Sequence, residues 1–425
     1  MLEAVIILLV LFGLLFAGIP IAFALGGLGA LLLYFGDFSS LMAPQTLYSA
    51  MDSFVLIAVP LFLLMSNILL KAGVGKDLFG AAQAWVGHLP GGLAVATVLS
   101  CGIFAAVSGS SVATAATIGV VSIPEMIERG YSRKFALGLL AAGGTLGILI
   151  PPSIPMIVYG VVTEESILDM FLAGIGPGIL LIVLFCGFSM LYAKFDKRFQ
   201  MQPKADWAER KLRTKQTLPT LVLVIIMLGG LYAGIFTPSE AGGVGFVCAL
   251  LLTTVIQRRL TWTDFKEALI DSMKTTVTIL LIVAGAKIFG KAITLYQLPQ
   301  EFSTLIADTF QSQGTMILAI CLSLLVFGLF LEALSMMLIM VPLLLPTLIV
   351  FGVDPIWFGI VFVIMIECAL ITPPVGLNIY VIQAVGKATM AEVSAGVWPF
   401  VLLMLLCVIA VYFFPAIALY IPFST

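Results

Sequence analysis

Two double prolines interrupt long apolar stretches of the sequence, Pro151-Pro152 in the first half and Pro373-Pro374 in the second. Consecutive prolines remove two backbone donors, leave carbonyl oxygens unpaired and force a helix to unwind. At membrane depth, irregular backbone is tolerated only where it is buried in protein or lines a water-filled cavity. The two interruptions therefore mark places where the chain could offer carbonyl oxygens to an ion or a solute.

Small polar residues accompany both interruptions. The turn Ser108-Gly109-Ser110-Ser111 precedes the first, and the second half offers Phe330-Leu331-Glu332-Ala333-Leu334-Ser335, then Thr372 and Asn378. Freed carbonyls and hydroxyls form sites of hard, mostly neutral oxygen ligands. The sequence places no carboxylate near the first site, so a proton has nothing suitable to titrate there and Na⁺ suits it better. Half-helix N-termini at the same breaks would attract an anionic substrate.

A simpler interpretation is that the prolines are kinks in ordinary membrane helices, where Pro and Gly are common. The two double prolines lie at equivalent places in the two halves of the chain, and each follows a segment that could form a helical hairpin. This correspondence favours functional breaks over ordinary kinks. Two acidic residues also need weighing, because ionisable groups inside a membrane are costly. Glu332 is either functional or a cap near water. Glu367 is either functional or paired with a lysine, such as Lys287 or Lys291.

The composition indicates a membrane protein. Hydrophobic residues make up 61% of the 425 residues and charged residues only 10%, and long apolar stretches of this kind are typical of membrane-spanning helices. The formal net charge of −2 argues against a nucleic-acid partner.

The two halves of the sequence break at corresponding positions. A shift of 222 positions superimposes the double prolines and also Gly92 on Gly314, Pro124 on Pro346, Gly174 on Gly396 and Pro177 on Pro399. Halves of this kind are typical of secondary transporters built from inverted repeats. The basic stretch 194–215 is expected to be cytoplasmic. Counting outward from it inverts the halves, provided that 91–128 and 314–350 are re-entrant hairpins, and leaves both termini periplasmic.

The predicted fold is therefore an all-α membrane protein with inverted structural repeats, two re-entrant helical hairpins and two broken helices. The first repeat covers 1–193 and contains scaffold helices 1–70, an interfacial arm 71–90, a hairpin 91–130, a broken helix 133–163 and a helix 168–193. A basic cytoplasmic linker covers 194–216. The second repeat covers 217–425 and contains scaffold helices 217–292, an arm 293–312, a hairpin 313–352, a broken helix 355–386 and a helix 392–414.

Four segments resemble the large membrane subunit of tripartite ATP-independent periplasmic (TRAP) transporters. They are FAAVSGSSVAT at 104–114, GILIPPSI at 147–154, YAGIFTPSEA at 232–241 and PPVGLN at 373–378. The resemblance covers essentially the whole chain. It implies a Na⁺-driven importer of the bacterial inner membrane. In such importers, as in the ion transporter superfamily, a transport domain slides like an elevator against a scaffold. The transport domain would contain both hairpins and both broken helices. It also implies a small four-helix membrane subunit and a periplasmic substrate-binding protein as partners, and no organic cofactor.

The same resemblance implies site residues. One Na⁺ site would use Ser108, Ser111, Gly147, Ile150 and Pro152, many of them through backbone carbonyls. The symmetry-related Na⁺ site would use Phe330, Ala333, Ala369, Thr372 and Pro374. The substrate, an organic acid such as sialic acid or a C4-dicarboxylate, would contact Ser110, Ser153, Ser335 and Asn378, with Glu332 as a further candidate. The second turn is less polar than in many dicarboxylate members, which favours a sialic-acid-like substrate.

Three other functions would make different demands on the sequence. A stand-alone Na⁺-coupled carboxylate symporter of similar architecture stays open. An intramembrane enzyme would need a catalytic Ser/His or Asp pair, and the sequence shows none. The segment 285–292 resembles a nucleotide-binding P-loop, but it ends in Ala where Ser or Thr should bind Mg²⁺, which argues against ATP binding. A non-transporting scaffold would not explain polar turns aimed at two double-proline breaks. We therefore expect a transporter subunit and not an enzyme.

Overall fold

The computed structural model describes residues 2–39, 41–195, 203–310, 312–374 and 376–424. Every regular element in these ranges is a helix. Seven of the described helices are long and apolar enough to cross a membrane, or up to nine if each of two bent helix pairs is one span. This part of the chain is therefore an all-α membrane protein, as the composition predicts. Lys197 and Arg198 of the expected basic linker lie outside the described residues.

The first half begins with four helices and continues with six more. The elements are α1 (Leu2–Phe16), α2 (Ile21–Phe35), α3 (Met42–Met51), a 3₁₀ turn (Phe54–Ile57), α4 (Ala58–Lys71), α5 (Val74–Val86), α6 (Gly92–Ser108), α7 (Ser111–Glu128), α8 (Arg133–Leu149), α9 (Ile154–Thr163) and α10 (Ile167–Phe195). Helices α8 and α9 are bent by 42° across the first double proline.

The second half follows a similar order. Its elements are α11 (Trp207–Tyr232), α12 (Pro238–Leu251), a π-helical turn (Leu252–Ile256), α13 (Trp262–Leu295), α14 (Leu298–Thr309), α15 (Gln313–Phe327), α16 (Ala333–Val350), α17 (Pro355–Leu370), α18 (Leu377–Gly386), α19 (Met390–Phe413) and α20 (Ala416–Ser424). The second double proline lies between α17 and α18.

Three helices, α11, α3 and α20, differ from the expected spans. Helix α11 begins at Trp207, inside the segment predicted as linker, because the Asp206 carboxylate accepts a hydrogen bond from the Trp207 amide and caps the helix. Helices α3 and α20 are short elements that apolar span length alone does not indicate.

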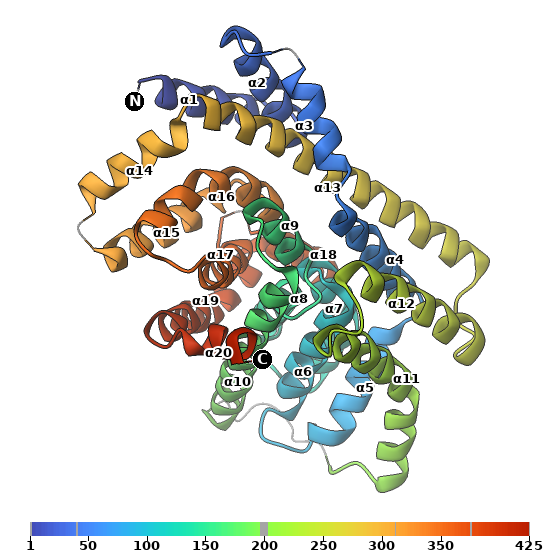
Figure 1. Cartoon of the computed structure of the whole chain (residues 1–425). Helices are drawn as coiled ribbons and strands as arrows, with labels where there is room; N and C mark the ends of the chain where they lie inside the picture. The colour runs from blue at the N-terminus through green and yellow to red at the C-terminus, as the bar shows by residue number, and fades with distance from the viewer. Residues whose placement is uncertain (1, 40, 196–202, 311, 375, 425) are drawn as a thin grey trace.

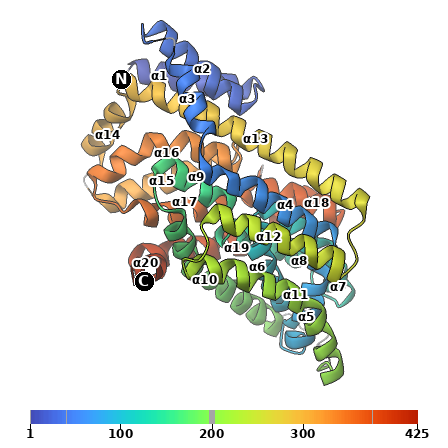
Figure 2. The ribbon, with the colours of Figure 1, turned by 45° about the vertical axis from the view of Figure 1, so that its right-hand side comes forward.

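The described helices form an outer layer, made of α1–α4 and α11–α13, and a body, made of α6–α10 and α15–α20, with α5 and α14 in contact with both. Helix α13 runs along one edge of the molecule with α2, α3 and α4 packed on it, and α12 packs on α4 and α11 (Figure 1). In the turned view, α4, α11 and α12 lie in front of the body, and α2 and α3 stand above it (Figure 2). In the body, α8 contacts α6, α7, α18 and α19. Both broken helices and both turn-linked helix pairs therefore lie in or against the body.

Glycines let the central helices of the body approach closely. Helices α8 and α19 cross at Gly138 and Gly396, where a Cβ atom on Gly138 would collide with the carbonyl of Gly396. This contact joins a helix from the first half directly to a helix from the second half. Any larger side chain here would push the two helices apart.

Polar contacts join segments that are far apart in the sequence. Lys71 pairs with Glu267 at 2.6 Å, and Arg259 pairs with Asp77. In the body, the Arg133 guanidinium donates to the carbonyls of Gly386 and Lys387, at 2.9 and 2.7 Å. These contacts connect α4 to α13, α5 to the segment before α13, and α8 to the end of α18.

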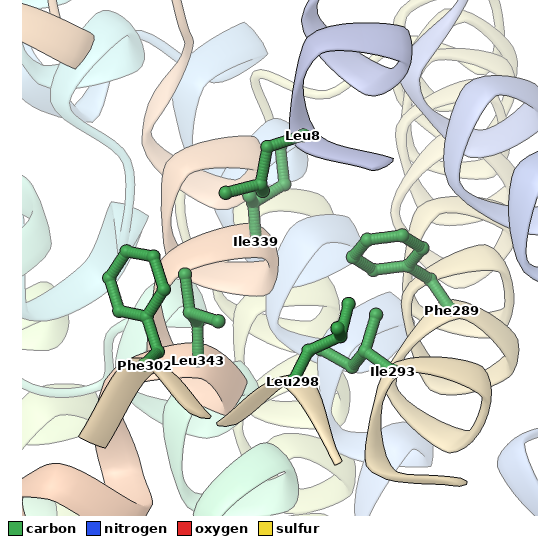
Figure 3. Close-up of a pocket in the computed structure, with 7 residues that line it drawn as sticks. All are labelled: Leu8, Phe289, Ile293, Leu298, Phe302, Ile339 and Leu343. Atoms are coloured by element: carbon green, nitrogen blue, oxygen red, sulfur yellow. The ribbon is translucent and has the colours of Figure 1, made fainter. Parts of the chain in front are cut away.

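Helix α16 meets the outer layer through apolar side chains. A small recess between α1, α13, α14 and α16 is lined by Leu8, Phe289, Ile293, Leu298, Phe302, Ile339 and Leu343 (Figure 3). These side chains offer no hydrogen-bonding group, so the recess is unsuited to a carboxylate solute.

Candidate functional site

A cavity of about 150 Å³ lies where the turn between α6 and α7 faces the turn between α15 and α16. We call it the central cavity. The first turn contributes Gly109, Ser110 and Ser111, and the second contributes Glu332. Its wall also includes Ile148, Ile154, Leu370 and Leu377 from both broken helices. Two of the residues predicted to contact substrate, Ser110 and Glu332, thus face one cavity from opposite halves of the chain.

The first turn lies directly against the first double-proline break. Gly109 has a φ of +58°, which favours glycine, and a Cβ atom on it would lie 2.6 Å from the carbonyl oxygen of Pro152. A Cβ atom on Gly147 would collide with the carbonyl of Ser110. The structure therefore places the first turn against both flanks of the first break. We call the predicted residues Ser108, Ser111, Gly147, Ile150 and Pro152 the first site.

Hydroxyl groups in the first turn are linked in a chain. Thr114 Oγ1 donates to the carbonyl of Ser110 at 2.8 Å, and Ser108 Oγ lies 2.7 Å from Thr114 Oγ1. Because the Thr114 proton is used toward Ser110, Ser108 is the donor in the second bond. Ser108 Oγ also accepts a long hydrogen bond from the Ser110 amide, at 3.4 Å. One lone pair of Ser108 Oγ then remains for a cation.

Asn378 reaches the first site from the other half of the chain. It is the second residue of α18 and is fully buried. Its side-chain amide donates to the hydroxyl of Ser111 and to the carbonyl of Ala141, the latter at 3.2 Å. Its expected contact with substrate stays a prediction.

The second break is organised differently. Thr372 Oγ1 donates to the carbonyl of Cys368 at 2.7 Å, and the Thr372 amide donates to the carbonyl of Ala369 at 3.1 Å. A Cβ atom on Gly328 would collide with the side chain of Ala369, so the end of α15 lies against the end of α17. Pro374 is exposed, and Ala333 begins α16. The predicted second site thus spans two neighbouring helix ends.

The turn between α15 and α16 points toward the outer layer. Phe330 is 61% exposed, and its ring meets that of Phe16 on α1 edge to face, with the centroids 5.7 Å apart. Ser335 Oγ donates to Glu332 Oε1 at 3.2 Å. Ser335 is itself fully buried, so of this pair only the Glu332 side chain is accessible.

Two other predicted residues have local structural roles as well. Ser153 is fully buried and caps α9, because its hydroxyl accepts a hydrogen bond from the Met156 amide at 3.4 Å. The side chain of Ile150 is apolar and packs toward Gly178 on α10. The group of Ile150 that could bind an ion is therefore its backbone carbonyl.

Glu367 does not pair with a lysine, so that interpretation was wrong. Its carboxylate is fully buried in α17 and has no hydrogen-bond partner in the described part of the chain. Lys287 donates instead to the carbonyl of Val161 at 3.1 Å, and Lys291 is exposed. The carboxyl group lies beside the backbone of Leu149, at the first break. The expectation that the first site has no carboxylate nearby was therefore also wrong.

Sequence reasoning missed the part of the cavity wall that the outer layer supplies. Thr275 and Ile279 from α13 and Leu63 from α4 face the central cavity. Thr275 Oγ1 already donates to the carbonyl of Asp271 at 3.0 Å, so its oxygen lone pairs stay available. No local motif marks these residues, since they belong to regular apolar helices.

Comparison with known proteins identifies the family. The sequence model described as "Tripartite ATP-independent periplasmic transporter, DctM component" matches residues 8–417. The chain belongs to the DctM family of TRAP transporters. A C4-dicarboxylate TRAP large permease of Pseudomonas aeruginosa is 36% identical over 94% of this chain and 93% of its own length. A sialic acid TRAP large permease of Vibrio cholerae is 34% identical over 96% of each.

Family membership fixes several general properties. This DctM-family chain is a multi-pass transporter permease of the bacterial inner membrane and not an enzyme. As the large permease of a tripartite system, it works with a small membrane subunit and a periplasmic binding protein. Its fold is also similar to that of the Alcanivorax borkumensis YdaH transporter, with a TM-score of 0.63 at 15% identity over 92% of this chain and 89% of that one.

Proposed function

We propose that this subunit couples the inward movement of Na⁺ to the uptake of a carboxylate solute that a periplasmic binding protein delivers. The observation that carries the proposal is the central cavity, where turns from both halves meet beside both double-proline breaks. Freed carbonyls and hydroxyl oxygens at such breaks suit a small hard cation.

Two Na⁺ sites are proposed, one at each break. The first uses Ser108, Ser111, Gly147, Ile150 and Pro152, and the second uses Phe330, Ala333, Ala369, Thr372 and Pro374. The close packing of Gly147 against Ser110 and of Gly109 against Pro152 supports the first set. The contact between Gly328 and Ala369 supports the second.

The proposed substrate is an organic acid, with sialic acid favoured over a C4-dicarboxylate. Relatives of similar identity are named for either substrate, so overall similarity does not separate them. The second turn supports the preference for sialic acid, because Leu331, Ala333 and Leu334 are apolar and Glu332 is the accessible polar side chain of this turn. Ser110 and Glu332, which face the central cavity, are proposed to contact the substrate directly, and the buried Ser153 and Ser335 are proposed to contact it after the turns rearrange.

We propose that transport follows an elevator movement of the body against the outer layer. The two layers and the apolar contact of α16 with α1, α13 and α14 support this idea, because apolar surfaces can slide without losing hydrogen bonds (Figure 3). The matching order of helix breaks in the two halves supports inverted repeats, with both termini on the periplasmic side.

Uptake into proteoliposomes tests the proposal. The chain is reconstituted with its small membrane subunit, and labelled sialic acid is offered with and without an inward Na⁺ gradient and the cognate binding protein. Uptake that needs both supports the proposal. Na⁺-dependent uptake of a dicarboxylate but not of sialic acid keeps the mechanism and discards the substrate. Uptake without any binding protein would favour a stand-alone symporter instead.

A further inference from the structure

The carboxamide of Asn378 joins the two halves of the chain at the first site. Its nitrogen donates to Ser111 Oγ at the start of α7 and to the carbonyl of Ala141 in α8. The orientation of the amide follows from this bonding, because a backbone carbonyl can only accept a hydrogen bond. Two acceptors therefore hold the nitrogen on one side of the group, and the oxygen is fixed on the other.

That oxygen, Asn378 Oδ1, is buried and has no hydrogen-bond partner among the described residues. A buried polar atom without a partner destabilises the folded state, because its hydration is lost and not replaced. In native proteins such an atom usually indicates a bound ion or water. The rest of the side chain is fully bonded, so the unpaired oxygen needs its own explanation.

The geometry allows one cation to bind both Asn378 Oδ1 and Ser111 Oγ. The oxygen and nitrogen of an amide are about 2.3 Å apart, and the nitrogen is within one short hydrogen bond of Ser111 Oγ. The two oxygens are therefore no more than about 5 Å apart. A cation with the radius of Ca²⁺, which Na⁺ nearly shares, takes oxygen ligands at about 2.3–2.6 Å and spans such a pair.

We propose that Asn378 is a ligand of the first Na⁺ site, supplied by the second half of the chain. Its oxygen binds the ion directly, and its nitrogen holds Ser111 in place. This inference rests on the proposed Na⁺ coupling and adds a residue to the same site, in place of the substrate contact predicted for Asn378 from the sequence.

The inference gives α18 a role in ion binding. Helix α18 follows the second break and is fixed at both ends, by Asn378 at its start and by Arg133, which donates to the carbonyls of Gly386 and Lys387 at its end. The first site is complete only while α18 is docked on α7 and α8. Ion binding at the first break therefore depends on the arrangement of the second.

Thermal unfolding of the purified chain in detergent tests this without transport. Na⁺ that binds only the folded protein raises the unfolding temperature, and titration against K⁺ at constant ionic strength gives a dissociation constant. We expect Asn378→Leu and Asn378→Ala to raise this constant at least tenfold. Asn378→Asp should stay within threefold of wild type, because it keeps an oxygen and adds a negative charge.

Two further variants test whether Asn378 binds the ion or only supports the packing of the site. Ser189→Ala removes a buried hydroxyl on α10 that bonds only the Phe185 carbonyl of its own helix, and it should leave Na⁺ affinity unchanged. Ser111→Ala combined with Asn378→Leu should weaken Na⁺ binding no more than the worse single variant, since both residues act on one ion.

Several results would overturn the inference. Na⁺ affinity of Asn378→Leu within twofold of wild type removes Asn378 from the site. An equal loss in Asn378→Leu and Asn378→Asp reduces its role to holding Ser111. A wild-type chain that Na⁺ stabilises no more than K⁺ does would overturn both this inference and the proposed Na⁺ coupling. A normal wild-type response with unaffected variants would overturn the inference alone.

Discussion

The two turns that meet at the central cavity differ in chemistry and in what holds them. The turn Ser108 to Ser111 consists of small polar residues and lies against Pro152 and Gly147. The turn from Gly328 to Glu332 is mostly apolar, and its Phe330 is exposed and contacts α1. One turn is thus fixed inside the body, and the other touches the outer layer.

This difference teaches that matching break positions do not imply matching chemistry. Oxygen ligands that are held in place bind an ion with little loss of freedom, so the first turn is the better cation site. The second turn keeps one carboxylate, Glu332, next to the cavity and has few polar contacts to the body. It is therefore expected to form the weaker of the two proposed Na⁺ sites, while Glu332 is free to meet the solute.

The largest expected effect comes from a side chain placed between the first turn and its break. Gly147→Ala puts a Cβ atom into the carbonyl of Ser110, and neither backbone can yield easily. Na⁺-dependent uptake should fall at least about 100-fold, measured in proteoliposomes at equal protein content. Gly243→Ala on α12 is the control, because no atom lies within 4 Å of its added Cβ. Equal activity of both variants would contradict the fixed first turn.

Removing one hydroxyl from each site compares them directly. Ser108→Ala should raise the Na⁺ concentration for half-maximal uptake about tenfold, which corresponds to about 1.4 kcal/mol. Thr372→Ala should raise it less, about threefold, because backbone carbonyls at the second break keep most of the site. Unchanged Na⁺ dependence in both variants would refute the site assignment, and a larger effect for Thr372 would reverse the comparison.

Glu332 in the second turn should distinguish the two candidate substrates. Sialic acid can donate hydroxyl hydrogen bonds to a carboxylate, so Glu332→Gln should raise KM for it about fivefold, since hydrogen bonds to charged groups are the stronger ones. A dicarboxylate is repelled by Glu332, and the same variant should lower its KM. Initial uptake rates over a range of binding protein loaded with substrate give these values. A changed Na⁺ dependence instead would move Glu332 into an ion site.

The smallest expected effect on transport comes from Glu367. Glu367→Met removes two buried carboxylate oxygens that lack partners and fills a similar volume. We expect stability to increase by about 1–3 kcal/mol, seen as a higher unfolding temperature, with uptake within twofold of wild type. Loss of Na⁺-dependent uptake would instead assign this carboxyl group to the first site, where its position beside Leu149 would explain it.

Local features of the sequence predicted the elements around the site. Consecutive prolines end a helix whatever surrounds them, so α8 stops at Leu149 and α17 at Leu370, each just before its break. Apolar length gave the long helices, because a membrane imposes a fixed span. Four short segments were enough to indicate the family that the whole-chain comparisons then showed.

Contacts between distant residues could not be predicted in this way. Asn378 bonds Ser111 across 267 positions of sequence, and no spacing rule connects them. One of the two interpretations of Glu367 paired it with a lysine because opposite charges attract, but Lys287 donates to the carbonyl of Val161 instead. Thr275 and Ile279 face the cavity only because α13 crosses it, which depends on how two layers pack.

The bond from Lys287 to Val161 is a polar contact between the outer layer and the body. Lys287 belongs to α13, and Val161 lies in the last turn of α9. If the body moves along the outer layer, the hydrogen bond from Lys287 to the Val161 carbonyl has to break. The distance between positions 287 and 161 then measures how far the body has moved. A pair of spin labels or a cysteine cross-link at these positions would serve as a ruler for the transport cycle.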